Sequence, residues 1–121
     1  MSNNKIVDIS NFVNIKTIEN LRNLDLANNL IEIIVSLEGL KNLEFLNLAE
    51  NKISKIENLQ MLTKLWILNL KNNLISSLEN LNDMQLTELD LTNNRICKLE
   101  NLKIPNLVKL NLSWNQVANF A

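Results

Sequence analysis

One arrangement of leucines and asparagines recurs along most of this chain. The frame L-x-x-L-x-L-x-x-N begins at five leucines, spaced 22, 22, 21 and 21 residues apart: Leu21, Leu43, Leu65, Leu86 and Leu107. The L-x-L alternation in each frame predicts a short strand whose leucines face one side. In the segment that follows, apolar residues recur at every third position, as at Ile53, Ile56, Leu59 and Leu62. That period predicts 3₁₀ or irregular turns, because residues three apart share one face of a 3₁₀ helix.

A repeat of this length and frame resembles the leucine-rich repeat. The phrase N-x-I-x-x-I-E-N-L at Asn51–Leu59 resembles the 22-residue repeat class of protein phosphatase 1 regulatory subunit 7. U2 small nuclear ribonucleoprotein A-prime, the repeat-type axonemal dynein light chain and the bacterial internalins share that class. The resemblance covers Ile9 to Phe120. Internalin repeats usually carry proline in the turn, and Pro105 is the one proline here, so the intracellular branch fits better.

The resemblance implies an α/β-class, right-handed solenoid, or horseshoe, with short parallel strands on the concave face and 3₁₀ or irregular turns on the convex face. We expect one domain over 1–121, because a single repeat cannot bury its leucines and the stack must share one core. Its parts are expected to be an N-terminal half repeat over 1–20, full repeats over 21–42, 43–64, 65–85 and 86–106, and an incomplete last repeat over 107–121.

The C-terminal end of the stack is expected to be open. Val117 and Phe120 would lie there, partway through the last repeat. Two interpretations follow: the chain is a fragment or a natural short form, or this end is covered by a partner, of which a second copy of the chain is one.

The asparagine that closes each frame is expected to be buried. One follows every predicted strand: Asn29, Asn51, Asn73, Asn94 and Asn115. The chain bends there, and buried backbone groups in a bend need hydrogen-bond partners. A side-chain amide can both donate and accept, so we predict a stacked asparagine ladder. By contrast, the Glu and Asn residues of the return turns are interpreted as solvated convex surface. These are Glu19, Glu57, Glu79 and Glu100 with Asn20, Asn58, Asn80 and Asn101.

Composition argues against an enzyme. The chain has no His and no Tyr, one Gly and one Cys, so the commonest general base, a glycine-rich phosphate loop and a zinc cluster are all missing. Cys97 has no His to activate it, and we interpret it as a small, semi-buried turn residue. We therefore expect no catalysis, no cofactor and no metal.

Charge and cysteine usage restrict the partners and the compartment. The net charge is −1 and no basic region stands out, which argues against a direct nucleic-acid partner or a membrane surface. A lone cysteine cannot form an internal disulfide, and Met1–Asp8 lacks the pattern of a signal peptide. We expect an intracellular protein, cytoplasmic or nuclear.

The positions that the frame leaves free predict a protein-binding concave face. Alternation sends the x residues of L-x-L outward, and parallel strands about 4.8 Å apart place Phe45 beside Ile67. Neither of these residues nor Trp66 is needed by the core. An apolar centre with a charged rim is typical of protein interfaces. The predicted binding residues are Phe45, Trp66, Ile67, Glu44, Asn47, Asn69, Lys71, Glu88, Asp90, Lys109 and Trp114.

These observations favour a protein–protein interaction scaffold. The resemblance implies a partner on the concave face, and a Ser/Thr phosphatase catalytic subunit is the specific expectation. The alternative is a structural or assembly subunit, or part of a longer repeat protein, in a cytoskeletal or ribonucleoprotein complex.

Overall fold

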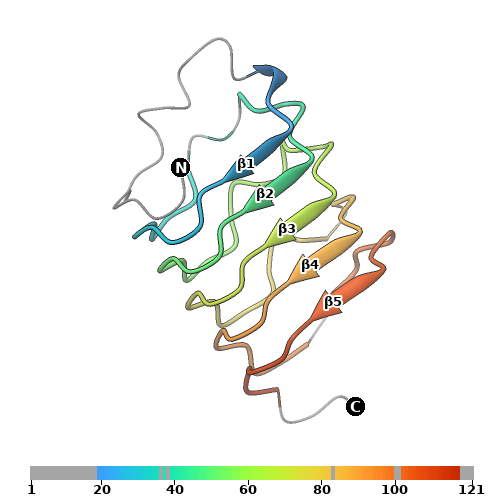
Figure 1. The fold of residues 1–121 in the computed structure, drawn as a ribbon. Helices are drawn as coiled ribbons and strands as arrows, with labels where there is room; N and C mark the ends of the chain where they lie inside the picture. Colours follow the sequence, from blue (N-terminus) through green and yellow to red (C-terminus); the bar gives the residue numbers. More distant parts are fainter. Residues whose placement is uncertain (1–18, 36, 38, 83, 100–101, 118–121) are drawn as a thin grey trace.

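The chain forms a solenoid with one parallel sheet. The computed structural model describes residues 19–35, 37, 39–82, 84–99 and 102–117. Its strands are β1 (Asn23–Asp25), β2 (Phe45–Asn47), β3 (Ile67–Asn69), β4 (Glu88–Asp90) and β5 (Lys109–Asn111), and their order in the sheet is their order in the chain. Figure 1 shows them stacked side by side, with the connecting segments returning behind the sheet. The predicted solenoid of parallel strands is confirmed. Most of the half repeat predicted over 1–20 lies outside the described residues, as does Phe120.

The strands pair without stagger, which fuses their leucines into one core. The central leucines of neighbouring strands are direct partners: Leu24, Leu46, Leu68, Leu89 and Leu110. From Leu24 to Leu89 these side chains are at most 5% exposed, whereas Leu110 is 37% exposed because no described strand pairs with the outer side of β5. The return segments add further fully buried residues, including Ile53, Ile56 and Leu59. The aliphatic interior is therefore continuous across the repeats.

The return segments close with 3₁₀-type hydrogen bonds. The N–H of Leu62 donates to the carbonyl of Leu59 at 3.0 Å, and the N–H of Leu65 donates to that of Leu62 at 3.1 Å. The described residues contain no α-helix, in agreement with the period of three. No helix in that part of the chain is long and apolar enough to span a membrane.

The predicted asparagine ladder is confirmed, and it links successive repeats. Asn73 Nδ2 donates to the carbonyl of Leu70 in its own repeat at 3.0 Å and to that of Leu48 in the preceding repeat at 2.9 Å. Asn73 Oδ1 accepts from the N–H of Ile53 at 3.0 Å. Asn51, Asn94 and Asn115 repeat this arrangement. In the described part of the chain, no buried side-chain polar atom lacks a partner.

The convex turns are largely exposed, as predicted, and their asparagines also bond the preceding repeat: Asn20, Asn58 and Asn80 are exposed. Asn58 and Asn80 adopt left-handed backbone conformations, with φ of 62° and 61°. Their Nδ2 atoms donate to the carbonyls of Ile34 and Ile56, one repeat earlier, at 2.6 and 2.8 Å. Asparagine suits this position because it tolerates the left-handed region better than most residues. Glu19 and Glu79 are exposed and Glu57 is half-buried, while Glu100 and Asn101 lie outside the described residues.

A second left-handed position comes directly before each ladder asparagine. Its φ values are 59° at Asn28, 56° at Glu50, 58° at Asn72, 55° at Asn93 and 60° at Trp114. Three of these five residues are asparagines, whose side chains reduce the cost of a left-handed backbone. A tryptophan has no such compensation. Trp114 is also 82% exposed, so little packing offsets its strain.

The ladder predicts a large effect of Asn73→Leu. The change leaves the N–H of Ile53 without a partner and removes one of the two ladder bonds that each of the carbonyls of Leu48 and Leu70 accepts. Since an unsatisfied buried group costs roughly 1–3 kcal/mol and a lost hydrogen bond about 1 kcal/mol, we expect about 3 kcal/mol of lost unfolding free energy in urea denaturation. The matched control is Asn23→Leu, at an exposed position of β1, with a change within about 0.5 kcal/mol. Equal losses for the two variants would contradict the ladder's role.

The left-handed position predicts that Trp114→Asn stabilises the fold. Relief of strain should raise the unfolding free energy by about 1 kcal/mol and move the urea midpoint upward. Trp66→Asn is the control, because Trp66 does not have a positive φ and is 53% exposed, so the change only removes packing. A midpoint that falls for both variants would show that Trp114 is held by contacts rather than strained.

Candidate protein-binding face

The outward side chains of the strands lie in three rows across the sheet. The first row is Asn23, Phe45, Ile67, Glu88 and Lys109; the second row is Asp25, Asn47, Asn69, Asp90 and Asn111; the third row, just beyond the strands, is Ala27, Ala49, Lys71, Thr92 and Ser113. The strand register aligns the first and second rows residue by residue. The order of the side chains along each of these two rows, from β1 to β5, is therefore fixed by the sheet.

A hollow of about 430 Å³ lies over the first two rows, mainly between β3 and β5. Its lining brings together six of the residues predicted to bind a partner: Phe45, Ile67, Asn69, Glu88, Asp90 and Lys109. Phe45 and Ile67 are register partners, half-buried on the outer side of the sheet, where the core does not need them. Asn111 also lines the hollow and was missed by the sequence analysis. Its place in the second row was the signal that could have identified it.

The second row has a structural task that the sequence analysis did not assign. In each member the side-chain Oδ1 accepts the backbone N–H two residues later, at 2.9–3.0 Å. These Asx turns end every strand in the same way. Asn47, Asn69 and Asp90 are therefore not free surface positions, although each keeps a second polar atom that can contact a partner. The recurrence of Asp or Asn at one frame position in all five repeats was the available signal.

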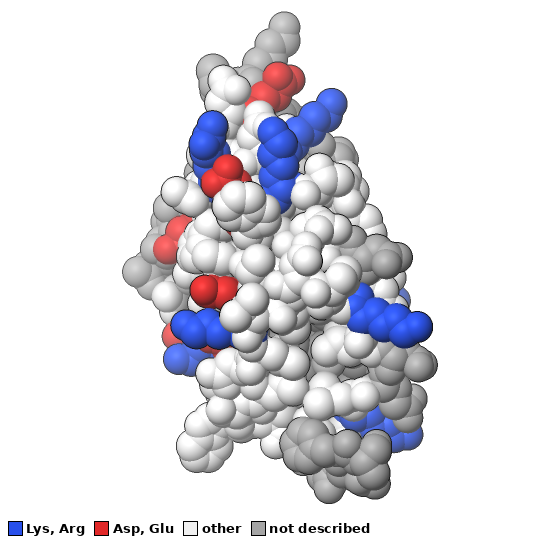
Figure 2. All heavy atoms as spheres, turned by 90° about the vertical axis from the view of Figure 1, so that its right-hand side faces the viewer, with Lys and Arg blue, Asp and Glu red and all other residues white. Residues whose placement is uncertain are grey.

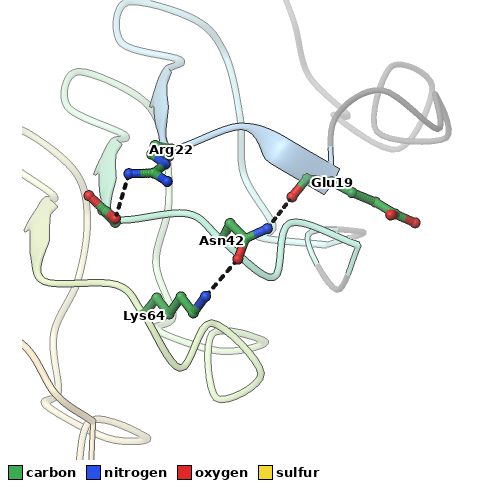
Figure 3. Close-up of polar contacts among 5 residues, drawn as sticks. Glu19, Arg22, Asn42 and Lys64 are labelled. Atoms are coloured by element: carbon green, nitrogen blue, oxygen red, sulfur yellow. Dashed lines mark hydrogen bonds and ion pairs between the residues drawn. The ribbon is translucent and has the colours of Figure 1, made fainter.

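At the β1–β2 end, charged and polar groups near the start of the strands bind one another (Figure 3). Glu44 forms an ion pair with Arg22 at 3.8 Å. Asn42 donates to the carbonyl of Glu19 at 2.8 Å and accepts from Lys64 Nζ at 2.8 Å. Glu44, a predicted binding residue, is thus already paired, although such exposed pairs contribute little stability.

The same edge becomes apolar toward β5. Trp66, just before β3, is 53% exposed, and Val108, just before β5, is 84% exposed. Thr87 lies between them in the sheet, and its hydroxyl donates to the carbonyl of Trp66 at 3.3 Å. Figure 2 looks onto this side: charged side chains gather toward the β1 end, and a broad uncharged band continues toward the β5 end. The sequence analysis included Trp66 in the site but omitted Val108.

Five of the predicted residues do not line the hollow: Glu44, Asn47, Trp66, Lys71 and Trp114. Lys71 and Trp114 follow β3 and β5, at the edge where the strands end, and neither lines the hollow. Trp66 and Trp114 therefore stand on opposite edges of the sheet. They cannot be treated as one aromatic cluster.

The chemistry of this face suits binding. The hollow offers apolar side chains, carboxylates, amides and one ammonium group. Within the described residues, no group of three or more His, Cys, Asp or Glu side chains is placed to hold a metal ion. Cys97 is a free thiol and is exposed there, so the interpretation of it as semi-buried was wrong. Apolar packing and paired charges are the interactions that such a surface can make.

Comparisons with known proteins place the fold in a family. The leucine rich repeats (2 copies) family matches residues 19–60, and the leucine rich repeat family matches residues 85–105. Curated protein sequences give no significant match. The sequence analysis favoured the phosphatase-regulatory and other intracellular relatives over the internalins, and the comparisons do not show that finer assignment.

Several solved structures are similar. An internalin (inlF) from Listeria monocytogenes is 35% identical with a TM-score of 0.83, over 96% of this chain and 34% of that one. An internalin C2 from the same organism is 32% identical with a TM-score of 0.83, over 98% of this chain and 52% of that one. The leucine-rich repeat domain of APL1B is 25% identical with a TM-score of 0.60, over 80% of this chain and 36% of that one. The chain spans about a third to a half of these proteins. With its repeated frame, its register and these matches, it belongs to the leucine-rich-repeat family.

Proposed function

We propose that this chain is a protein–protein interaction scaffold that holds a folded partner against the face around Phe45, Trp66 and Ile67. One observation carries the proposal. Two bulky apolar side chains lie side by side on the outer surface of the sheet, next to a half-exposed tryptophan, with no role in the core. Tryptophan is enriched among the residues that contribute most to binding, and such residues lie at the centre of an interface.

The surroundings of this apolar centre support the proposal. Glu88, Asp90 and Lys109 border it on the β4–β5 side, and the uncharged edge at Val108 extends it. A polar rim around an apolar core is the usual anatomy of a protein interface. Leucine-rich-repeat domains typically bind protein partners.

A more specific proposal is that the partner is a Ser/Thr phosphatase catalytic subunit inside the cell, in the cytoplasm or nucleus. The phrase at Asn51–Leu59, which resembles the repeats of a phosphatase regulator, supports the partner. The single cysteine supports a reducing compartment. Titration of this chain with a purified catalytic subunit of protein phosphatase 1 tests the partner. Absence of binding would rule out the phosphatase partner and leave the general proposal of a protein-binding face standing.

The general proposal predicts where a photo-crosslinker will capture a partner. With p-benzoylphenylalanine at Ile67, we expect a discrete protein adduct in cells, identified by mass spectrometry. The control at Lys55, exposed in a return turn, should not form it. Phe45→Ala combined with Trp66→Ala should weaken binding of the identified partner at least tenfold, because loss of central anchors costs about 2 kcal/mol. Adducts that are equal at the two positions, or absent from Ile67, would contradict the proposed face.

Assembly is the second candidate, and the apolar exposure at β5 favours it. Val108, Leu110 and Trp114 are 84%, 37% and 82% exposed there. If this end associates with another copy, light scattering should give a mass that rises with concentration, and Val108→Asp should abolish the rise. A monomer at all concentrations would contradict this candidate and leave the first one intact. Val117, which was expected at the open end, is half-buried against the core.

A further inference from the structure

The first row of the concave face carries an ordered set of chemical types. From β2 to β5 it reads Phe45, Ile67, Glu88 and Lys109, which is apolar, apolar, acidic and basic. The four residues are register partners on adjacent strands, so their order along the face is fixed by the sheet. A partner that complements the row has apolar, apolar, basic and acidic groups in the same order.

The two charged members of the row are available to a partner. Glu88 is half-buried and Lys109 is exposed. In the part of the chain that the structure describes, the ion pair is the one between Arg22 and Glu44, at the other end of the face, and Glu88 forms none with Lys109. Because Glu88 is partly withdrawn from water, an opposite charge brought to it is screened less than at an open surface.

The spacing of the row matches one kind of partner backbone. Four adjacent strands span about 14 Å from the first to the last. On an α-helix, positions i, i+4, i+7 and i+11 share a face and span about 16 Å. On an extended segment, four residues facing the same side span about 20 Å. The four side chains of a helix lying across the strands therefore match the spacing of the four row residues to within about 2 Å. The four side chains of an extended segment span about 6 Å more than the row, which is more than the distance between two strands.

The other rows leave room beside the first. Asn47, Asn69 and Asp90 in the second row are drawn into turns by their own side chains. Ala27 and Ala49 in the third row are small and buried. The hollow over β3–β5 adds depth next to Glu88 and Lys109.

We propose that this face binds an amphipathic helix of a partner protein, laid across β2–β5. The helix presents apolar, apolar, basic and acidic side chains at i, i+4, i+7 and i+11. The apolar pair packs on Phe45 and Ile67, beside Trp66, while the basic group pairs with Glu88 and the acidic group with Lys109. This proposal rests on the proposed function and adds the structure and the charge order of the ligand.

Three peptides test the proposal against the whole chain. The first is an alanine-based helix of about 18 residues with Leu, Leu, Arg and Glu at i, i+4, i+7 and i+11, long enough to be helical alone. The second exchanges only Arg and Glu. The third is the first with proline at i+5, away from the contact positions, which breaks the helix. Dissociation constants come from fluorescence anisotropy of labelled peptides, with helicity checked by circular dichroism.

The expected result is a preference that a charge swap inverts. The protein should bind the first peptide about tenfold more tightly than the second, since two correct pairs instead of two like-charge contacts are worth about 1.4 kcal/mol. Glu88→Lys combined with Lys109→Glu keeps the net charge and should prefer the second peptide by a similar factor. The proline peptide should bind at least tenfold more weakly than the first.

Several outcomes would overturn the inference. They are equal binding of the first two peptides, a preference that the charge swap leaves unchanged, undiminished binding of the proline peptide, and no binding of any peptide. Urea denaturation confirms that the charge-swapped protein is folded. The crosslinking experiment at Ile67 uses none of these peptides, so a partner captured there together with failure of the peptides would leave the proposed function standing and remove only the helix.

Discussion

The bend after each strand is the constraint on which this structure depends. The chain turns from the sheet into the return segment while still buried, so its carbonyls and amides cannot reach water. Asparagine side chains supply the missing partners, and each one bonds both its own repeat and the preceding repeat. The ladder therefore also sets how one repeat sits on the next. That fixed placement is what puts Leu46 beside Leu68 and Phe45 beside Ile67.

The outward surface follows from the same stacking, because once the leucines take the inner face the remaining strand positions can serve either local structure or binding. The second row is committed to closing the strands through Asx turns. The first row makes no such bonds, so its variation from Phe45 and Ile67 to Glu88 and Lys109 carries the information for a partner. The edge at the strand starts adds to this, because it is uncharged toward β5 and charged toward β1 (Figure 2). The β1 end and the β5 end of this face therefore differ chemically, so a partner can bind in one orientation.

The features that could be predicted from the sequence are those in which a residue has the same role at the same position of every repeat. The leucines and the ladder asparagines recur once per turn, so their roles could be worked out without coordinates, as could the outward direction of Phe45 and Ile67. The grouping of the site was only partly predictable. Glu44 is paired with Arg22, because side-chain pairing depends on how neighbouring turns approach each other. The opposite edges of Trp66 and Trp114 follow from their different places in the repeat frame. The bonds of Asn58 and Asn80 to the preceding turn could not be foreseen from exposure arguments, since they require the left-handed backbone that the turn imposes.

The sequence by itself determined the repeat, the inward leucines and the asparagine ladder, because burial of apolar side chains and satisfaction of buried backbone act on every repeat alike. The tertiary structure decided which outward side chains bond to one another and where the surface is hollowed. The hollow forms where Ile67, Glu88 and Lys109 come into register on three strands, although they lie about one repeat apart in the chain. Register and side-chain pairing across repeats are properties of the stacked sheet, and the linear pattern does not contain the pairing that Arg22 and Glu44 adopt.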